Sequence, residues 1–297
     1  MAIPAPLIEI FLMEHFYRAW RGRLLTLGRQ TICADADRLS EILTAYGVGW
    51  DRAAARYDRR TVQSSLSQGA NYITDETLFS SFCPDVALDV LDVTDYEGAN
   101  LIYNLCDRLP ETLFGRFDLI FNGSVLDNIF DPAQALRNIS QLLAPDGRVI
   151  HIEMASNLGF EYLIYSTDWF LDYYVMNDFV DCRVYVCTFK NVDELLYGAW
   201  TVHAYMPRPN GDATSLRELG FEQAVVVIVA EKGAQSRFDV TPVQWCYRDE
   251  AMKQEYCEKL ARLDERRPVF GFGSRAAQEF STIKRGGFYD CGIIAGR

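Results

Sequence analysis

The clearest alternation of apolar and polar positions lies in the middle of the chain, between Arg116 and Glu153. The run FDLIF is typical of a strand buried on both faces of a parallel sheet. Asp131 and Pro132 then supply an N-cap and a first helical turn, and apolar residues recur on one face of the helix that follows. APDG ends this helix, and RVIHIE resumes as a strand. The pattern predicts a strand–helix–strand unit, which implies a parallel pair of strands with a right-handed crossover.

Other apolar runs predict further strands on both sides of this unit. Upstream, Leu24 to Gly28, Val86 to Val93 and Asn100 to Leu105 each have the length and composition of a strand. Downstream, DCRVYVCTF and EQAVVVIVAEKG are rich in β-branched and aromatic residues. Strands that alternate with helices indicate an α/β protein with a mainly parallel sheet.

Helical patterns fill most of the remaining chain. Between Gly28 and Val86 we predict helices in DADRLSEILTAYG, in the more polar DRAAARYDRRTVQSSLSQG, and in ITDETLFSSFC, which Thr74 or Asp75 caps. Ser166 caps a helix with an aromatic face that runs to Phe179, and DEAMKQEYCEKLARLDERR is a polar helix near the end. MAIPAPLIEIFLMEHFYRAW predicts an amphipathic or buried helix and no signal peptide, because it lacks a basic start and contains two glutamates.

The simplest division of the chain is one domain with two additions. Residues 1–234 form the α/β domain, and 29–85 is a helical insertion within it. The insertion could form a lid over a substrate pocket, or it could be a packed helical decoration or a dimer contact. Residues 235–297 form an appendage that we expect to pack on the same domain.

Charge and hydropathy narrow the classes of partner. The net charge of −12 and the pI near 4.8 disfavour nucleic acid and anionic membrane surfaces, so we expect a small-molecule partner. No apolar run reaches the length of a transmembrane helix. These features predict a cytoplasmic protein, with a homodimer as one oligomeric state that they allow.

The cysteines and histidines do not form a metal-binding pattern. The eight cysteines contain no C-x-x-C pair, and there are three histidines in the whole chain. We therefore predict no metal site and interpret the cysteines as reduced, mostly buried thiols. His151 lies within a predicted strand and is interpreted as a core histidine with satisfied hydrogen bonds.

Four stretches, in this order, resemble the class I S-adenosylmethionine (SAM)-dependent methyltransferases. LLTLGRQ matches the first strand and cofactor turn, and LDVLDVTDYEGANLIYNLCDRLPE matches the second and third strands. The unit from Asp118 to Glu153 is similar to the fourth strand, the helix and the fifth strand, with Pro145-Asp146-Gly147 at the family's proline-glycine-glycine turn. The resemblance covers Leu24 to Gly233 and implies a seven-stranded, mainly parallel Rossmann-like sheet, with helices on both faces and the last strand antiparallel.

The resemblance also implies which residues meet the nucleoside part of SAM. Asp92, followed by Val93, matches the acidic residue that accepts hydrogen bonds from the ribose hydroxyls; Asp89 or Asp95 would take that place if the register shifted. Asn104 and Leu105 match the pair that meets the adenine, with asparagine where the family often has aspartate. As an isolated residue, Asn104 could equally be a turn asparagine.

Around the methionine part of SAM, the chain departs from the family pattern. Leu27 and Gly28 match the end of the first strand and its first glycine, but Thr26 replaces the usual acidic residue, and Arg29 and Gln30 replace the second and third glycines. We hypothesise that Arg29 or Gln30 binds the SAM carboxylate, Arg29 in a bidentate manner. At the end of the fourth strand, Asn122 and Gly123 are expected to face the cofactor, and they are followed by Ser124.

Candidates for the catalytic groups lie near the expected mouth of the site. They are Asp127, Glu161 and Tyr165, with Tyr162 beside them. The function that the resemblance implies is transfer of a methyl group from SAM to an oxygen or nitrogen of a small molecule, such as a sugar or secondary metabolite. The alternative is a non-catalytic methyltransferase-like protein that acts as a partner or scaffold, for which the single-glycine turn argues. A nicotinamide-dependent oxidoreductase would need a glycine fingerprint that the chain lacks.

Overall fold

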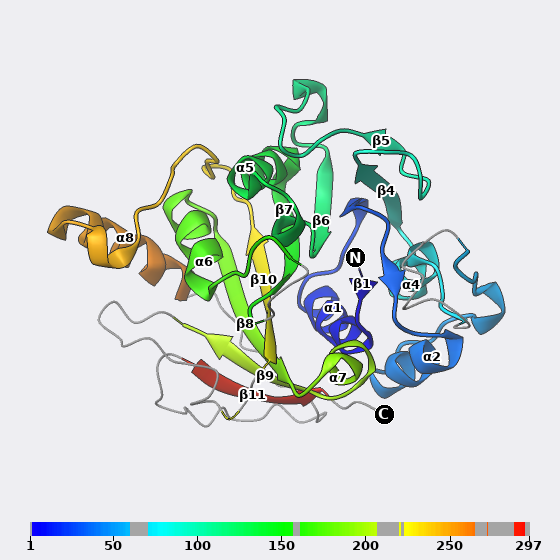
Figure 1. Cartoon of the computed structure of the whole chain (residues 1–297). Helices are drawn as coiled ribbons and strands as arrows, with labels where there is room; N and C mark the ends of the chain where they lie inside the picture. Colours follow the sequence, from blue (N-terminus) through cyan, green and yellow to red (C-terminus); the bar gives the residue numbers. More distant parts are fainter. Residues whose placement is uncertain are drawn as a thin grey trace.

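The computed structural model describes residues 2–59, 71–156, 161–206, 220, 223–264, 272 and 288–294. A nine-stranded sheet forms its centre, in the order β11-β9-β8-β10-β7-β6-β2-β4-β5 (Figure 1). The strands are β2 (Gly22–Leu27), β4 (Val86–Asp92), β5 (Leu101–Ile102), β6 (Phe117–Gly123), β7 (Leu143–Met154), β8 (Asp181–Phe189), β9 (Trp200–Tyr205), β10 (Gln223–Glu231) and β11 (Phe288–Ile294).

One half of the sheet is parallel and the other is mostly antiparallel. β5, β4, β2, β6 and β7 pair in parallel, so their carboxyl ends lie at one edge. β10 runs antiparallel between β7 and β8, and β9 and β11 continue the antiparallel pairing beyond β8. The fold is therefore an α/β fold with a mixed sheet, which confirms the class predicted from the strand–helix alternation.

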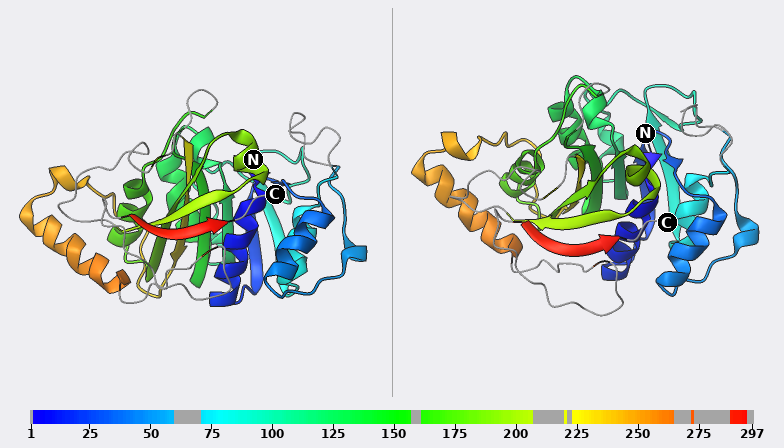
Figure 2. Two further views of the ribbon diagram at one scale, coloured as in Figure 1. Left: turned by 90° about the horizontal axis from the view of Figure 1, so that it is seen from below. Right: turned by 60° about the horizontal axis from the view of Figure 1, so that its bottom comes forward.

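The prediction of seven strands was wrong in number, because β9 and β11 extend the sheet. The other seven strands agree with the expectation, and the last of them, β10, is antiparallel to both neighbours. Figure 2 shows β11, in red, alongside β9 at the outer end of the sheet. The predicted strand from Asn100 to Leu105 is shorter than expected, since only Leu101–Ile102 pairs with β4.

Alternating strand residues form two apolar faces, and helices cover both. Leu24, Phe121 and Ile150 pack with α1 (Ala5–Tyr17), α2 (Ala36–Ala45) and α4 (Asp75–Phe82). Ile120 and Val149 face the opposite side, where α5 (Pro132–Leu142), α6 (Thr167–Met176) and α8 (Glu250–Asp264) lie. This alternation is what a sheet buried on both faces requires.

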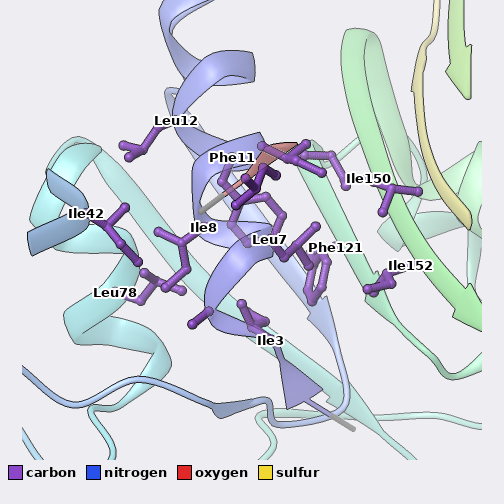
Figure 3. Packing of buried hydrophobic residues seen from close by; sticks show 14 of the residues in the cluster. Ile3, Leu7, Ile8, Phe11, Leu12, Ile42, Leu78, Phe121, Ile150 and Ile152 are labelled. Carbon is purple, nitrogen blue, oxygen red and sulfur yellow. The ribbon is translucent and has the colours of Figure 1, made fainter. Parts of the chain in front are cut away.

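Helix α1 is buried along most of its length, which decides between the amphipathic and buried predictions for the N-terminal segment. Its apolar side chains lie between the sheet and the helices α2 and α4, as Figure 3 shows for Leu7, Ile8 and Phe11. The Phe11 ring meets the Phe121 ring edge-on, with 5.1 Å between centroids. Burying large aromatic side chains in this way stabilises the helix against the sheet.

The chain between β2 and β4 contains more than the predicted helices. A short strand, β3 (Thr31–Ile32), pairs in parallel with β1 (Ala2–Ile3), and α2 and α4 follow, with Asp35 and Thr74 as N-caps. The helix predicted over 51–69 was wrong at its start, where only a 3-10 turn, η1 (Arg52–Ala54), forms; residues 60–69 lie outside the described residues.

The predicted elements of the C-terminal half are present where the structure describes them. Helix α6 begins after Ser166, and α8 packs on it through apolar residues that include Tyr256 and Leu260. A short helix, α7 (Val192–Tyr197), lies between β8 and β9, and its Leu196 side chain is buried. Three further 3-10 turns lie elsewhere along the chain: η2 (Glu111–Leu113) before β6, η3 (Leu126–Asn128) before α5, and η4 (Trp245–Tyr247) before α8.

Candidate functional site

The candidate site lies at the edge of the sheet where the parallel strands end. Leu27 is in register with Leu91 on one neighbouring strand and with Asn122 on the other. The Gly28 N–H donates to the Leu91 carbonyl at 2.7 Å, and Gly28 has a φ of +69° that favours glycine. The structure thus brings Leu27, Gly28, Asp92 and Asn122 together, because parallel strands present their carboxyl ends at one edge.

Asp92 is the carboxylate that β4 presents at this edge. Its Oδ1 accepts the Val93 N–H at 2.6 Å, and its Oδ2 accepts no hydrogen bond from any described residue. Asp89, the alternative upstream in the strand, is buried and bound to Arg23 and to Asn100. Val93 is 60 % exposed, so an apolar surface lies next to the open carboxylate oxygen.

Asn104 and Leu105 follow β5 at the same edge. The Asn104 Oδ1 accepts the Cys106 N–H at 3.0 Å, which is the turn geometry that the alternative interpretation expected. The Asn104 side chain is exposed, whereas Leu105 is buried, and its carbonyl accepts from Asn138 at 2.8 Å. Asn138 lies on α5, so this helix fixes the loop that carries Asn104.

Arg29 is buried, and each of its three guanidinium nitrogens donates a hydrogen bond within the chain. Nη1 lies 2.9 and 3.0 Å from the two oxygens of Asp75 and 3.2 Å from Glu76 Oε1. Nη2 donates to the Gly98 carbonyl at 3.0 Å, and Nε donates to the Glu97 carbonyl at 3.3 Å. Arg29 therefore joins the start of α4 to the loop after β4, and its donors are engaged within the chain.

Gln30 is buried beneath the end of β6. Its Nε2 donates to the carbonyls of Leu27 and Gly28 at 2.8 and 3.2 Å, which fixes the orientation of the amide. The other end of the amide, Oε1, has no hydrogen-bond partner among the described residues. A Cβ added at Gly123 would lie 2.2 Å from this oxygen, so the glycine leaves the space that Oε1 needs.

A chain of buried polar side chains crosses from β6 to β7. Asn122 Nδ2 donates to His151 Nδ1 at 2.9 Å and to Glu153 Oε1 at 2.5 Å. The second ring nitrogen of His151, Nε2, lies 2.6 Å from the Tyr174 hydroxyl. Complete burial lowers the pKa of His151 to about 3, so the ring is neutral at pH 7. The interpretation of His151 as a satisfied core residue is confirmed.

Asp127 lies at the other end of this chain, in η3. Its Oδ2 accepts the Ser124 hydroxyl at 2.5 Å, and its Oδ1 accepts the Asn128 amide at 2.6 Å. Its backbone N–H donates to Glu153 Oε2 at 3.3 Å. Burial raises the pKa of Asp127, and burial together with the Asp127 charge raises the pKa of Glu153 well above its usual range.

The remaining predicted catalytic residues lie on a segment that packs over η3. The Tyr165 hydroxyl donates to the Leu126 carbonyl at 2.7 Å, and burial raises the pKa of Tyr165. The charge of Glu161 raises the pKa of Asp127, which places the two carboxyl groups near each other. Tyr162 is 67 % exposed, and its N–H donates to the Asp127 carbonyl. The structure therefore gathers Asp127, Glu161 and Tyr165 in one place.

Glu153 and Ser124 are the polar groups of the site that were not among the predicted catalytic residues. The signal for Glu153 was present, because His151 and Glu153 alternate on one face of RVIHIE, beside Asn122 on β6. The His151 and Glu153 side chains lie on the same face of the sheet as Ile120 and Val149, which is the face that α5 and α6 cover. Two polar residues at strand spacing on a buried face are rare without a specific partner.

Exposed apolar side chains surround the site. Phe130 is 89 % exposed and meets Tyr162 edge-on, with ring centroids 5.5 Å apart. Tyr96, which follows β4, and Ile102, at the end of β5, are also exposed. Apolar side chains of this size, concentrated near convergent polar groups, are typical of the rim of a ligand site.

A pocket of about 420 Å³ lies at the opposite edge of the sheet, near the amino ends of the strands. Arg18, Asp118 and Arg148 contribute to its lining. Two of its three arginines are paired within the chain, since Arg148 contacts Glu14 at 3.3 Å and Arg18 contacts Glu231. It is therefore separate from the candidate site.

The residues at the carboxyl edge fit the hydrogen-bonding groups of SAM in part. A ribose diol offers two donors, and the open Oδ2 of Asp92 is an acceptor for them. An ammonium group is a donor, and the unpartnered Oε1 of Gln30 is a buried acceptor at the cofactor turn. Arg29, in contrast, has its donors occupied by Asp75 and backbone carbonyls.

Within the described ranges, no cluster of three or more histidine, cysteine or carboxylate side chains could hold a metal ion. No helix in the same part of the chain is long and apolar enough to cross a bilayer.

Comparisons with known proteins place this fold beside SAM-dependent methyltransferases of class I. Neither a family model nor a curated protein sequence matches the chain. Among solved structures, it is similar to the CMeT domain of the citrinin polyketide synthase, at 13 % identity over 77 % of this chain, with a TM-score of 0.39. It is also similar to phosphoethanolamine N-methyltransferase 2 from Haemonchus contortus, solved with phosphomonomethylethanolamine and S-adenosylhomocysteine, at 14 % identity over 76 % of this chain, with a TM-score of 0.41.

A third similar structure is a SAM-dependent methyltransferase from Thermotoga maritima, described as a possible histamine N-methyltransferase. It shares 16 % identity over 77 % of this chain and 89 % of its own length, with a TM-score of 0.36. The match covers about half of the first two structures, 52 % of each.

Proposed function

We propose that this protein is a SAM-dependent methyltransferase that acts on an oxygen or nitrogen of a small molecule. The observation that carries the proposal is the set of open acceptors at the carboxyl edge of the parallel strands. Asp92 Oδ2 and Gln30 Oε1 are both without a hydrogen-bond donor among the described residues, and Gly28 and Gly123 flank them. The order of strands and the similarity to class I methyltransferases support the same activity.

Each residue has a definite task in this proposal. Asp92 accepts from the ribose hydroxyls, Val93 and Leu105 border the adenine, and Gln30 Oε1 accepts from the ammonium group. Gly28 allows the backbone to approach the ligand closely. Bound SAM supplies an electrophilic methyl group, and the protein holds the acceptor atom in line with it and excludes water.

We assign Arg29 a positioning role instead of the carboxylate contact that the sequence led us to expect. Its ion pair with Asp75 ties α4, in the segment 29–85, to the loop that follows Asp92. In this proposal the segment contributes a wall of the site. Asn122 supports the floor, because its amide holds both His151 and Glu153.

The alternative is a methyltransferase-like protein that does not catalyse transfer. The contacts of Arg29 favour this alternative. Its guanidinium group already binds Asp75 and the Gly98 carbonyl, so Arg29 does not supply a cation for the cofactor carboxylate at the turn. A scaffold of this kind would retain the fold and the apolar rim but would not need the open oxygen of Asp92.

Calorimetric titration of the full chain with S-adenosylhomocysteine tests the proposal. We expect binding that weakens in Asp92→Asn, while Asp118→Asn, at the opposite edge of the sheet, binds as the wild type does. Absence of binding at millimolar S-adenosylhomocysteine would rule out the enzyme. Binding without transfer of a radiolabelled methyl group to any of a panel of amines, phenols and alcohols would favour the scaffold.

A further inference from the structure

Ser124 has a backbone conformation that is unusual for a residue with a side chain. Its φ is +60°, in the left-handed region, where a non-glycine residue is strained. Three hydrogen bonds hold it there: its N–H donates to the Ile152 carbonyl at 2.9 Å, its carbonyl accepts from Asn128 at 3.0 Å, and its hydroxyl donates to Asp127 at 2.5 Å. The strain is located at the end of β6, where the candidate site lies.

The geometry makes Ser124 the link between the site and Asp127. The Asp127 side chain is completely buried, whereas Ser124 is partly exposed. A ligand at the carboxyl edge can therefore reach the Ser124 oxygen but not the carboxylate behind it. With its proton donated to Asp127, the Ser124 oxygen keeps its lone pairs for a donor on the ligand.

Asp127 and Glu153 form a buried pair of carboxyl groups without a cation. Within the described part of the chain, no lysine or arginine forms a hydrogen bond or ion pair with either group. The titratable neighbours are Glu161 and Tyr165 on the covering segment, and His151, which is neutral and reaches Glu153 through Asn122. Two neighbouring carboxyl groups in such surroundings favour a single negative charge and one retained proton.

The hydrogen bonds decide where the charge and the proton lie. Asp127 accepts two short bonds, from the Ser124 hydroxyl at 2.5 Å and from the Asn128 amide at 2.6 Å. Glu153 accepts one short bond, from Asn122, and two long ones of 3.3 Å from the backbone N–H groups of η3. The two short bonds stabilise the charge on Asp127 more than the single short bond stabilises a charge on Glu153, which leaves the proton on Glu153.

We propose that Ser124 and Asp127 form a proton relay for a hydroxyl acceptor, and that protonated Glu153 positions Asp127 in it. This inference rests on the proposed function and narrows its acceptor to a hydroxyl group. The acceptor oxygen forms a bond to the methyl carbon while the carbon–sulfur bond breaks, and sulfur keeps the electron pair. The acceptor's proton passes to Ser124 Oγ, and the Ser124 proton passes to Asp127 Oδ2, so that charge and atoms balance.

The carboxyl pair can be tested without cofactor or acceptor. Infrared difference spectra of the full chain at pH 7 should contain a protonated carboxyl band that Glu153→Gln removes and deuterium exchange shifts. Glu111→Gln, at a carboxylate exposed on the surface, is the matched control and should leave the band intact. An unchanged band in Glu153→Gln would overturn the assignment of the proton.

The relay is tested by transfer of a radiolabelled methyl group from SAM to a panel of phenols, alcohols and amines. We expect transfer to hydroxyl compounds, a loss of about 100-fold or more in Asp127→Asn and Ser124→Ala, and loss of the acidic limb of the pH profile in Asp127→Asn. Glu153→Gln keeps an oxygen that can accept from the backbone N–H groups of Leu126 and Asp127, so its rate should stay within about threefold, whereas Glu153→Ala should shift the pH profile.

Calorimetry with S-adenosylhomocysteine distinguishes failure of the relay from failure of the proposed function. If the wild type does not bind S-adenosylhomocysteine, the proposed function fails, whatever the infrared result. If it binds, then transfer that is confined to amines, absent from the whole panel, or undiminished in Asp127→Asn and Ser124→Ala overturns the relay. Binding should be equal in the wild type and in all variants.

Discussion

The buried ion pair between Arg29 and Asp75 allows a direct test of the role of Arg29, which stands where the family pattern has a glycine. The test asks whether Arg29 stabilises the fold or binds the ligand. Arg29 is 6 % exposed and Asp75 is 1 % exposed, and the guanidinium makes further contacts with Glu76, Glu97 and Gly98. If these contacts are its purpose, then Arg29→Met damages the protein by removing the cation beside Asp75, a carboxyl group whose pKa burial already raises to about 7. The double variant Arg29→Met/Asp75→Asn removes both charges and should recover most of the loss.

The expected magnitudes follow from burial and chain length. Removing one partner of a buried pair costs about 3–5 kcal/mol. The unfolding entropy of a chain of 297 residues is about 0.6 kcal/mol/K if all of it unfolds in one step. Arg29→Met should therefore lower the Tm by about 5–8 °C, and the double variant should return to within about 3 °C of the wild type.

Calorimetry with S-adenosylhomocysteine then separates the two roles of Arg29. As a structural tie, Arg29 is dispensable once Asp75 is neutral, so the double variant should bind within about threefold of the wild type. If Arg29 instead binds the ligand carboxylate, the double variant loses a charged hydrogen bond worth about 1.5–3 kcal/mol, or roughly 10- to 150-fold in affinity. Arg108→Met, at an arginine exposed on the surface, is the control. Recovered stability without recovered affinity in the double variant would refute the positioning role.

Three further predictions concern the site and the buried residues around it. Asp92→Asn should weaken S-adenosylhomocysteine binding roughly tenfold or more without changing the Tm, because one acceptor oxygen is lost; the control Asp95→Asn should bind as the wild type does, and an equal loss in both would contradict the assignment. Burial lowers the pKa of His151 from 6.5 to about 3, so its contribution to stability is present above pH 6.5 and is lost as the pH falls toward 3. The loss is at most about 1.4 kcal/mol per pH unit; urea unfolding at pH 7 and 5 should show a smaller acid loss in His151→Gln, and equal losses would refute the buried neutral ring. Gly123→Ala places a Cβ 2.2 Å from Gln30 Oε1 and should cost about 1–3 kcal/mol, of which Gln30→Ala in the same chain should recover part; a neutral Gly123→Ala would contradict the packing.

The strands and helices that were predictable carry their own local signals. The unit from Phe117 to Met154 combines an apolar strand run, an N-cap at Asp131 and a one-sided helix, and each signal indicates the same structure. β9 and β11 were not predicted because each forms where a partner strand offers free hydrogen-bonding groups, β9 beside β8 and the edge strand β11 beside β9. The segment FYDCGII follows glycine-rich turns in the sequence, and its pairing with β9 comes from residues about ninety positions away.

The common edge of the candidate residues was predictable from the strand pattern, but their contacts were not. Parallel strands place their carboxyl ends at one edge, so Asp92 and Asn122 could be assigned to one site from the strand pattern alone. The partner of Arg29 lies 46 residues downstream, on a helix whose packing depends on the whole sheet. No local pattern distinguishes an arginine that binds a ligand from one that binds Asp75.

The structure explains how this turn can have one glycine where the family pattern that the sequence resembles has several. Glycines in a cofactor turn serve to keep side chains away from the ligand. In this chain Arg29 extends to α4, and Gln30 folds under β6, where Gly123 leaves room for its amide oxygen. Both side chains also bind backbone carbonyls, at Gly98 and Leu27 respectively, and so brace the turn. The one glycine of the turn is Gly28, whose φ of +69° a side chain would strain, and Gly123, at the end of β6, is a glycine because its Cβ would collide with Gln30. Loss of binding in Gln30→Leu, which keeps the volume but removes Oε1, would therefore indicate that the orphan oxygen contacts the ligand and does not merely fill space.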